Sequence, residues 1–537
     1  MSIHATCLLA AALSVATPSG FAQCPWSPLP PVATPGGPAL EFLGYPVALS
    51  GDDAAVGAPA DAATPGGSVY LLRRNGSVWS VAEKVAPNTP VAGTGFGAAL
   101  ALEGDRLVVG APYENAQGFH TGAVYVFART GGTWTQAAHL AASNAFRRDY
   151  FGSAVALDGS TALIGAYGAT ELGVHYNGAA YLFEERSGAW TETQRLLPAP
   201  GGERGLFGRA VALRGSVAVV GAPFEDPSAQ DCGAAYVFTR SGGTWSLATK
   251  LLALAPELGA EFGAAVAVTQ TRVFVGAPRY DGGQHRLGLG AVEVFRDLGG
   301  TWSFETELRP ADSVVGDYFG FALAARGDTL LVGAHGNPAS GLESGAAYEF
   351  GFANGAWHER QKLVAADAAS GARFGLSVAL DMDVALVGAP LASGSGGAGA
   401  GTGVAYAFDV PEASVSYGAG CPGSTGKTPT LGVLGCATAG GQVVLRVEDG
   451  TPGARVLVLV GKQRAAITLP SGCMQFVAPI LLTLMLPPIG ADGTSIGQLS
   501  IPAAAQPGRP YTLQAFVGGA SAGANLATSN GIEIVVQ

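Results

Sequence analysis

A Phe-Gly dipeptide that recurs at nearly constant spacing constrains this chain more than any other feature. Its copies begin, at steps of 55, 56, 55, 57 and 55 residues, at Phe96, Phe151, Phe207, Phe262, Phe319 and Phe374. A Gly-Ala pair follows each Phe after fourteen residues, and a degenerate copy at Leu43-Gly44 keeps this offset to Gly57. Self-similarity at a fixed period is typical of repeat architectures, so we expect seven copies of one structural unit.

Each unit carries the signals of four strands. In Ala99–Val109, two β-favouring runs flank a Gly-Asp turn, which predicts a hairpin. A third run alternates in the manner of a strand at Gly122–Phe127, and Trp marks a fourth at Gly132–Gln136. Four antiparallel strands in about 55 residues predict one blade of a β-propeller.

The tryptophans support the same unit. Each lies seventeen residues before a Phe-Gly or its Leu43-Gly44 equivalent, at Trp26, Trp79, Trp134, Trp190, Trp245, Trp302 and Trp357. The last unit has a third strand at Gly403–Phe408 but no Trp strand after it, so we expect the strand around Trp26 to complete that blade. Such pairing would close a ring of seven blades and cover the exposed edges. We expect the Phe and Trp rings to pack in the core rather than against a sugar.

The repeat resembles the FG-GAP repeats of the integrin alpha-subunit propeller and of many secreted bacterial proteins. The resemblance extends from Trp26 to about Phe408 and implies a seven-bladed β-propeller. Integrin-type repeats often carry a calcium loop of the form DxDxDGxxD, but the turns here are short, as at Leu102–Arg106 and Leu380–Val384. They lack the oxygen ligands that calcium needs. We therefore expect no metal and no cofactor, although the resemblance alone would allow calcium.

Three segments are expected. Residues 1–22 read as a secretory signal, with an apolar stretch at Cys7–Val15 and small residues before Gln23. Residues 23–410 form the propeller. Residues 411–537 form a C-terminal β-sandwich-like domain, predicted from short runs such as Gln442–Val447 and Tyr511–Val517. Its GxGCPGS opening resembles C-terminal modules attached to diverse secreted bacterial proteins, which implies no activity.

Charge and cysteine usage limit the partners. The net charge is −11 and no cluster of five to eight Lys and Arg residues occurs, which argues against nucleic acid. The apolar stretch Phe476–Leu486 is interrupted by Pro479 and is too short to span a bilayer. In an oxidising compartment we expect one disulfide among Cys421, Cys436 and Cys473, with their pairing open; the fates of Cys24 and Cys232 are left open, with a buried thiol the interpretation that suits Cys232 best. We expect a monomer.

The candidate ligand-binding residues lie in the loops between second and third strands, which should all emerge on one face of the ring. They are Tyr113, Glu114, His120, His175, Tyr176, Glu225, Asp226, Tyr280, Asp281, His285 and His335. Ordinary solvated loops would also be polar. If the face is functional, Tyr and His would stack on or hydrogen-bond a ligand, and the acids would orient it. No catalytic motif such as GxSxG or HExxH occurs in a suitable context.

Three functions compete. We expect a secreted, non-enzymatic, adhesion-type protein that binds an extracellular protein or carbohydrate through this loop face. The alternative is a polysaccharide hydrolase or lyase on a propeller scaffold, which would need Glu114, Glu225 or Asp281 close to His120 or His285. A purely structural envelope or matrix protein is the third. The fold alone does not choose among them.

Overall fold

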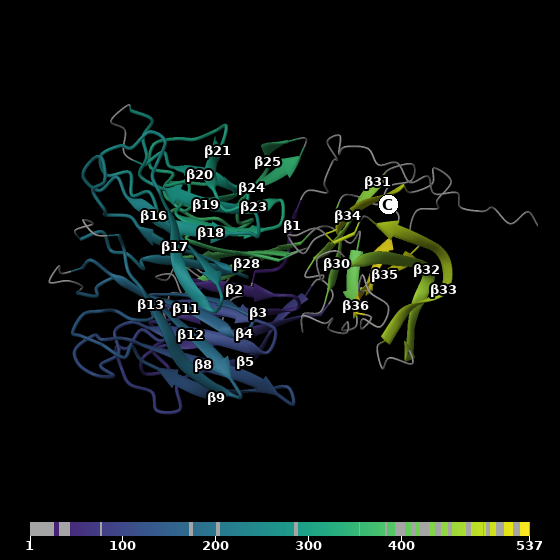
Figure 1. The fold of residues 1–537 in the computed structure, drawn as a ribbon, viewed down its shortest axis with the longest axis horizontal. Coiled ribbons are helices and arrows are strands. Elements are labelled where there is room, and N and C mark those ends of the chain that lie inside the picture. Colours follow the sequence, from purple (N-terminus) through teal and green to yellow (C-terminus); the bar gives the residue numbers. More distant parts are fainter. Residues whose placement is uncertain are drawn as a thin grey trace, which may run out of the picture. The chain divides into compact units, whose positions relative to one another are not determined.

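Short β-strands joined by tight turns form the regular structure of the chain, and the described residues contain no helix (Figure 1). The computed structural model describes residues 26–31, 43–75, 78–170, 176–199, 204–283, 288–353, 355–381, 384–392 and 403–409, and then 414–417, 429–434, 442–448, 454–468, 474–486, 488–489, 495–500, 510–518 and 527–535. The predicted signal segment, Cys24, Cys421, Cys436 and Cys473 lie outside them. The expectation of an all-β fold is confirmed.

Within the described residues, seven sheets have four antiparallel strands each, like the blades of a propeller. The first strands of the sheets are β2 (Val47–Ser50), β6 (Ala99–Glu103), β10 (Ala154–Asp158), β14 (Ala210–Arg214), β18 (Ala265–Val268), β22 (Ala322–Arg326) and β26 (Ser377–Leu380). The second strands are β3 (Asp53–Ala58), β7 (Arg106–Ala111), β11 (Thr161–Ala166), β15 (Val217–Ala222), β19 (Arg272–Ala277), β23 (Thr329–Ala334) and β27 (Val384–Ala389).

The third strands carry the Gly-Ala-x-Tyr or related runs: β4 (Ser68–Asn75), β8 (Ala123–Thr130), β12 (Ala179–Arg186), β16 (Ala234–Ser241), β20 (Ala291–Asp297), β24 (Ala346–Ala353) and β28 (Val404–Asp409). The fourth strands are β5 (Val78–Val85), β9 (Thr133–Leu140), β13 (Ala189–Leu196), β17 (Thr244–Leu251), β21 (Trp302–Leu308) and β25 (Ala356–Leu363). The last sheet takes its fourth strand from the other end of the chain. There β1 (Ser27–Pro28) pairs with β28, and Leu29 N donates to Ala407 O at 2.9 Å.

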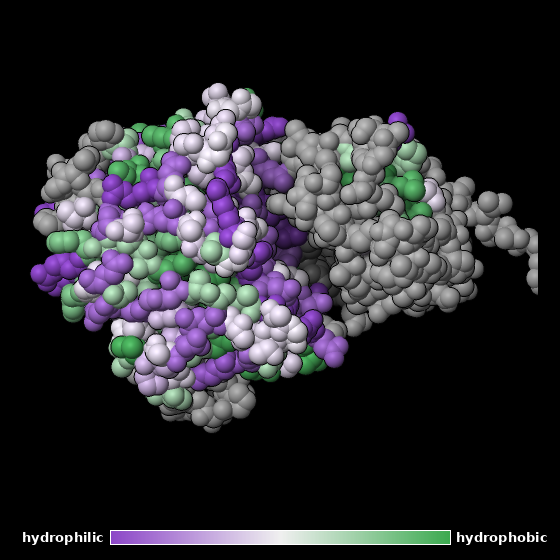
Figure 2. Space-filling model, turned by 60° about the horizontal axis from the view of Figure 1, so that its bottom comes forward, coloured by the Kyte–Doolittle hydropathy of each residue, from purple (hydrophilic) through white to green (hydrophobic). Residues whose placement is uncertain are grey.

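Neighbouring sheets share apolar cores. One cluster joins Val69 and Leu71 of the first sheet to Phe96, Leu107 and Trp134 of the second. Another cluster joins the first sheet to the last, with Leu43, Val56 and Leu72 beside Leu386 and Ala405. Each first strand contacts the first strands of the sheets before and after it, and β2 contacts both β6 and β26. Outward, the fourth strands alternate in exposure, so hydrophilic and hydrophobic residues are mixed on the surface in Figure 2.

The Phe-Gly dipeptide connects each sheet to the loop between the second and third strands of the preceding sheet. Phe96 is fully buried, and its ring meets Tyr125 edge-on at 5.3 Å and Phe127 at 5.9 Å. Its backbone N–H donates to Gly66 O of the preceding sheet at 2.8 Å. Gly97 follows at a φ of +93°, and a Cβ atom there would lie 2.7 Å from Ser68 O. The dipeptide therefore combines a large ring with a residue that has no side chain because the two backbones approach so closely.

The described strands from Ser414 onward form two further sheets. One has the order β29 (Ser414–Tyr417), β36 (Ala527–Val535), β35 (Pro510–Gly518), β32 (Arg455–Thr468) and β33 (Met474–Leu486). The other has the order β30 (Thr430–Leu434), β31 (Gln442–Glu448) and β34 (Ser495–Ser500). One buried cluster takes side chains from both, among them Leu445 and Val458. The chain divides into two compact units. These strands belong to the unit that includes Val410–Gln537, whereas Pro28–Phe352 and Trp357–Asp409 form the other.

The close approach at Gly97 gives a test of the repeat. We expect Gly97→Ala to lower the free energy of unfolding by at least about 3 kcal/mol, because the new methyl group collides with Ser68 O and the left-handed backbone is strained. Gly104→Ala is the matched control: Gly104 also has a positive φ, of +55°, but nothing lies within 4 Å of an added Cβ atom. It should cost only about 1–2 kcal/mol. Equal losses in urea unfolding would contradict this account.

Candidate functional site

Residues beside the Phe-Gly dipeptides meet in a basin where the starts of several first strands converge. This basin has a volume of about 320 Å³ and is lined by Tyr45, Arg209, Pro223, Phe224, Glu261, Ala264, Arg279, Phe321 and Leu376. We call it the central basin. Its lining comes from five sheets, those that begin with β2, β14, β18, β22 and β26. Five of these residues directly follow the Gly of a repeat: Tyr45, Arg209, Ala264, Phe321 and Leu376.

Charged groups in the central basin are arranged around one carboxylate. Arg279 Nε lies 3.1 Å from Glu261 Oε1. Burial raises the pKa of Glu261, while Arg279 and Arg209 act in the opposite direction. Glu261 also has a φ of +57°, but this conformation belongs to the repeat, since the residue before the repeat Phe has a similar φ in other copies, at Tyr150, Leu206, Tyr318 and Arg373. Arginine, carboxylate and aromatic groups thus face one hollow and can bind a ligand that has both polar and apolar surfaces.

A row of aromatic rings extends from Phe119 toward Arg209. His120 stacks on Phe119 with centroids 3.9 Å apart, and Tyr113 meets both His120 and Tyr150 edge-on. Tyr150 in turn stacks on Tyr167, and the guanidinium of Arg209 lies 5.8 Å from the Tyr167 ring centre. Burial raises the pKa of Tyr167 to about 12, so its hydroxyl remains protonated at neutral pH. The predicted residues Tyr113 and His120 are therefore brought together on this face.

A smaller pocket of about 220 Å³ adjoins the central basin and shares Glu261, Arg279 and Phe321 with it. His335 lines this pocket, stacked on Tyr318 at 5.2 Å and edge-on to Phe321 at 4.4 Å. Burial lowers the pKa of His335 to about 4, and Arg373 adds to the effect. The predicted residue His335 is thus neutral at physiological pH and belongs to an aromatic wall.

Two of the predicted acids are engaged inside their own sheets instead of facing a ligand. Glu225, only 3% exposed, accepts hydrogen bonds from the Tyr236 hydroxyl at 2.8 Å and from Lys250 Nζ at 2.6 Å. Glu114 accepts from the Tyr125 hydroxyl at 2.8 Å and lies 2.9 Å from His139 Nε2. These contacts hold the loop against the third and fourth strands. We therefore assign Glu114 and Glu225 a structural part.

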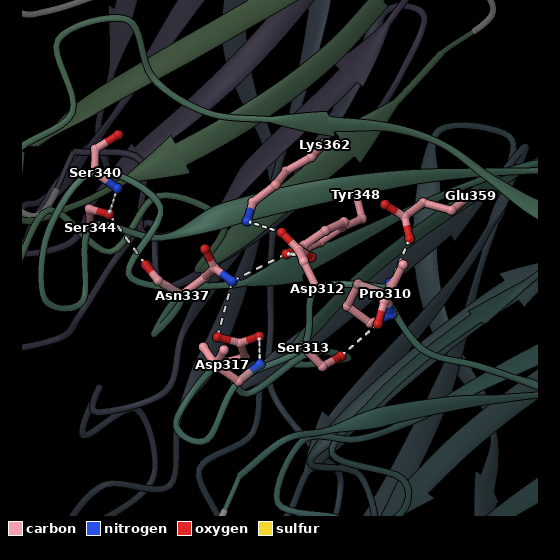
Figure 3. A network of polar contacts seen from close by, with 12 residues as sticks. Pro310, Asp312, Ser313, Asp317, Asn337, Ser340, Ser344, Tyr348, Glu359 and Lys362 are labelled. Atoms are coloured by element: carbon pink, nitrogen blue, oxygen red, sulfur yellow. Dashed lines mark hydrogen bonds and ion pairs between the residues drawn. The ribbon is translucent and has the colours of Figure 1, made fainter.

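We call the arrangement of Glu225, Tyr236 and Lys250 the clip: a carboxylate that accepts hydrogen bonds from a tyrosine of the third strand and a lysine of the fourth. The clip recurs in another sheet, with its acid taken from a different loop. In the sheet β22 to β25, Asp312 accepts from the Tyr348 hydroxyl at 2.8 Å and from Lys362 Nζ at 2.6 Å (Figure 3). Asn337 occupies the position of Glu225 and donates to the Tyr348 oxygen at 3.1 Å and to buried Asp317 at 3.0 Å. A carboxylate, a tyrosine and a lysine thus form a repeated support beneath the loop face.

The remaining predicted residues are dispersed. Asp226 is exposed and accepts from Asp231 N within its own loop at 2.6 Å. Tyr280 belongs to a core cluster, with Arg309 stacked 4.5 Å from its ring centre, and Asp281 N donates to Glu257 at 3.0 Å. Tyr176 lines a separate hollow of about 650 Å³. His175 and His285 lie outside the described residues, so their approach to any acid stays a prediction.

Sequence reasoning missed most of the central basin. Tyr45, Arg209, Phe321 and Leu376 stand directly after the repeat glycine, at a position that holds Ala98, Ser153 or Ala264 in the other copies. A comparison of this one position across the repeats would have identified the basin, because the residue is small in three copies and large in four, and all four large residues line the basin.

Three further features of the described residues concern metal ligands, membrane spans and cysteine. Across these ranges, no group of three or more His, Cys, Asp or Glu side chains is placed to hold a metal ion. None of the described segments is a helix long and apolar enough to cross a membrane. Cys232, whose fate the sequence left open, is buried and forms no disulfide.

The structural part of Glu225 is testable against its neighbour. We expect Glu225→Ala to lower the free energy of unfolding by about 2–4 kcal/mol, because it leaves Tyr236 and Lys250 without their acceptor. Asp226→Ala, at an exposed position in the same loop, should cost at most about 1 kcal/mol. Urea unfolding of both variants decides the point, and similar losses would argue against the clip.

The low pKa of His335 predicts a pH dependence of stability. The unfolded chain binds a proton near pH 6.5 but the folded one only near pH 4, so stability falls as the pH drops through this window. We expect about 2 kcal/mol of loss between pH 7 and pH 5 that His335→Gln abolishes. Glu293, whose pKa burial raises to about 7, makes the folded state more stable as the pH falls, and it does so equally in the unsubstituted protein and in the His335→Gln variant. Identical pH profiles for the two proteins would refute the assignment.

Comparisons with known proteins agree with the repeat. Five stretches match the FG-GAP repeat, at residues 79–127, 134–183, 190–238, 302–350 and 357–408. The interval between the third and fourth match holds the strands β18, β19 and β20, where the clip is altered: Tyr280 stands at the position of the acid and Glu293 at that of the tyrosine. No curated protein gives a significant match to the sequence.

Similar solved structures are distant. The β-propeller domain of the Trilobed protease from Pyrococcus furiosus is 9% identical, with a TM-score of 0.36 over 64% of this chain and 90% of that one. A subtype N11 neuraminidase-like protein of A/flat-faced bat/Peru/033/2010 (H18N11) is 12% identical, with a TM-score of 0.34 over 73% of this chain and 97% of that one. Pyrococcus horikoshii acylaminoacyl peptidase is 9% identical, with a TM-score of 0.37 over 76% and 59%. Likenesses this weak carry no argument about activity. The repeat matches and the blade-like sheets together support an FG-GAP β-propeller.

Proposed function

We propose that the protein is an extracellular, non-enzymatic, adhesion-type binding protein whose central basin engages a protein or a carbohydrate. The observation that carries the proposal is the lining of the basin, where five sheets contribute and four large side chains stand at a position that is small in the other three repeats. Tyr45, Arg209 and Phe321 are not required at this position by the fold, since Ala and Ser serve it elsewhere. Residues that exceed what the fold needs and share one hollow favour a ligand site.

The architecture that we propose for this function is a closed ring of seven FG-GAP blades followed by a β-sandwich. The core shared by the first and last sheets supports closure, as does the bridge between Leu43 and Gly403, which repeats the bridge between Gly122 and Phe151. The mixed core of the two C-terminal sheets supports the sandwich. The N-terminal sequence, with its apolar stretch before Gln23, supports secretion.

Binding is favoured over catalysis by the state of the loop acids. A general acid or base has to reach its substrate within hydrogen-bonding distance. Glu114 and Glu225, two of the three acids that the hydrolase alternative would use, are instead bonded to tyrosines and to His139 or Lys250. The third, Asp281, accepts from Gly283 N within its own loop at 2.8 Å. The carboxylate that does face the central basin, Glu261, is paired with Arg279, an arrangement suited to orienting a ligand.

The proposal predicts that one exposed phenylalanine matters and a similar one does not. Phe321, in the central basin, is 37% exposed, and Phe304, on the outer strand β21, is 38% exposed. Binding partners would first be found by screening the purified mature protein on arrays of glycans and extracellular proteins. We expect Phe321→Ala and Arg209→Ala each to weaken binding about tenfold or more, and Phe304→Ala to leave it unchanged.

The controls separate three outcomes. Circular dichroism and thermal melting establish that each variant is folded. Equal affinity of the Phe321→Ala and Phe304→Ala variants for an array ligand would place the site elsewhere on the molecule. Absence of any specific ligand from both arrays would favour the structural-component alternative over a binding protein.

A further inference from the structure

Three arginines line a hollow that is separate from the central basin. The hollow has a volume of about 650 Å³, within the usual range for small-ligand sites, and is lined by Phe146, Arg147, Arg148, Gly168, Thr170, Tyr176 and Arg204. We call it the arginine pocket. It lies between loops of the sheets that begin with β10 and β14 and shares no lining residue with the central basin.

The arginines are not balanced by acids in the described part of the chain. No carboxylate among those residues forms an ion pair with Arg147, Arg148 or Arg204, whereas most of the ion-paired arginines lie elsewhere on strands; Glu171 and Glu203 lie outside the described residues. Asp149 is next to Arg148 in sequence, but it is 2% exposed and accepts from Phe146 N at 2.6 Å. In a chain with a net charge of −11, the described lining of this hollow thus carries three positive charges and no carboxylate.

The backbone under two of these arginines is the second observation. Arg148 and Arg204 each stand three residues before a repeat Phe and have φ values of +64° and +54°. The other described copies carry glycine at this position, also with positive φ: Gly93, Gly259, Gly316 and Gly371. A side chain in the left-handed region is strained, and glycine relieves this strain. Both arginines are therefore less favourable than glycine for this backbone, although the Arg148 guanidinium also lies 5.8 Å from the Phe119 ring centre. Both residues line the same hollow.

A matched turn shows that the arginines are additions to a common scaffold. In the turn Phe146–Asp149, Asp149 N donates to Phe146 O at 3.2 Å, and Gly168 N donates to Asp149 O at 3.1 Å. The turn Val314–Asp317 has the same two bonds, with Gly336 in place of Gly168, both at 3.2 Å. It reaches this geometry with Val315 and Gly316 at the two middle positions. The turn itself has no need of Arg147 or Arg148.

We propose that the arginine pocket binds an acidic saccharide, with a carboxylate or sulfate group held by the guanidinium groups. Guanidinium forks match planar or tetrahedral oxyanions with paired hydrogen bonds. Phe146, which is 55% exposed, and Tyr176 supply ring surface for the apolar face of a sugar ring. Three arginines in one hollow suit a ligand with a few localised charges better than the extended polyanion of a nucleic acid. This site extends the proposed binding role but can fail independently of the central basin.

The test uses the full mature chain and substitutes the glycine found in the other repeats. Titration calorimetry would measure binding of a galacturonate tetrasaccharide, a sulfated chondroitin tetrasaccharide and a neutral tetrasaccharide at fixed ionic strength. We expect one or both acidic probes to bind and the neutral probe not to bind. Arg148→Gly and Arg204→Gly should each weaken that binding about 10- to 100-fold. Their melting temperatures should stay unchanged or rise by about 1–3 °C, because strain is removed.

The controls distinguish charge, strain and fold. Arg73→Ala removes an exposed arginine of β4 and should leave affinity unchanged. Arg148→Lys keeps the charge but not the fork and should lose most of the affinity. The proposal is overturned if the acidic probes bind no better than the neutral one, if the glycine variants bind normally, or if they melt several degrees lower, which would make the arginines structural. Binding of a phosphopeptide in place of both saccharides would also overturn it.

Discussion

The close approach between a repeat phenylalanine and the preceding loop is the contact on which the rest of the structure depends. The ring of Phe96 is fully buried against the third strand of its own sheet, while its backbone N–H bonds to Gly66 of the sheet before. Gly97 then lets the two main chains meet where a Cβ atom would collide. Because the contact joins one sheet to the next, each sheet is positioned by its predecessor, and the loops of the candidate sites inherit that position.

The tyrosines of the third strands connect this contact to the loop face. The ring of Tyr236 lies edge-on to Phe207, and its hydroxyl bonds to Glu225 in the loop above. Burial and the nearby Glu225 raise the pKa of that hydroxyl, so it stays a donor. The same side chain thus serves the apolar core with its ring and the loop with its oxygen. The loop that carries Arg148, a residue with positive φ, is held in a related way, since Asn144 Oδ1 accepts a hydrogen bond from the Tyr181 hydroxyl at 2.8 Å.

The sequence could predict those features that repeat, since seven copies make a pattern visible. The strands, the Trp26 strand in the last sheet and the burial of Phe and Trp all follow from periodicity. The orientation of single side chains does not, because Glu114 and Asp226 occupy similar loops but one turns inward to Tyr125 and the other stays in solvent. The central basin was missed for a related reason: it is assembled from five sheets, and residues such as Tyr45 and Phe321 lie far apart in the chain.

The pairing of β1 with β28 also has a consequence in time. The two strands are separated by roughly 380 residues, so a ribosome working at about 5–20 residues per second needs roughly 20 to 75 seconds to deliver the partner of the first strand. Until then, Ser27 and Pro28 have no sheet to join, and once β28 has formed, its outer edge remains open to other chains until β1 arrives. The last sheet is thereby made dependent on the oldest part of the chain, so a partial product cannot reach the finished fold.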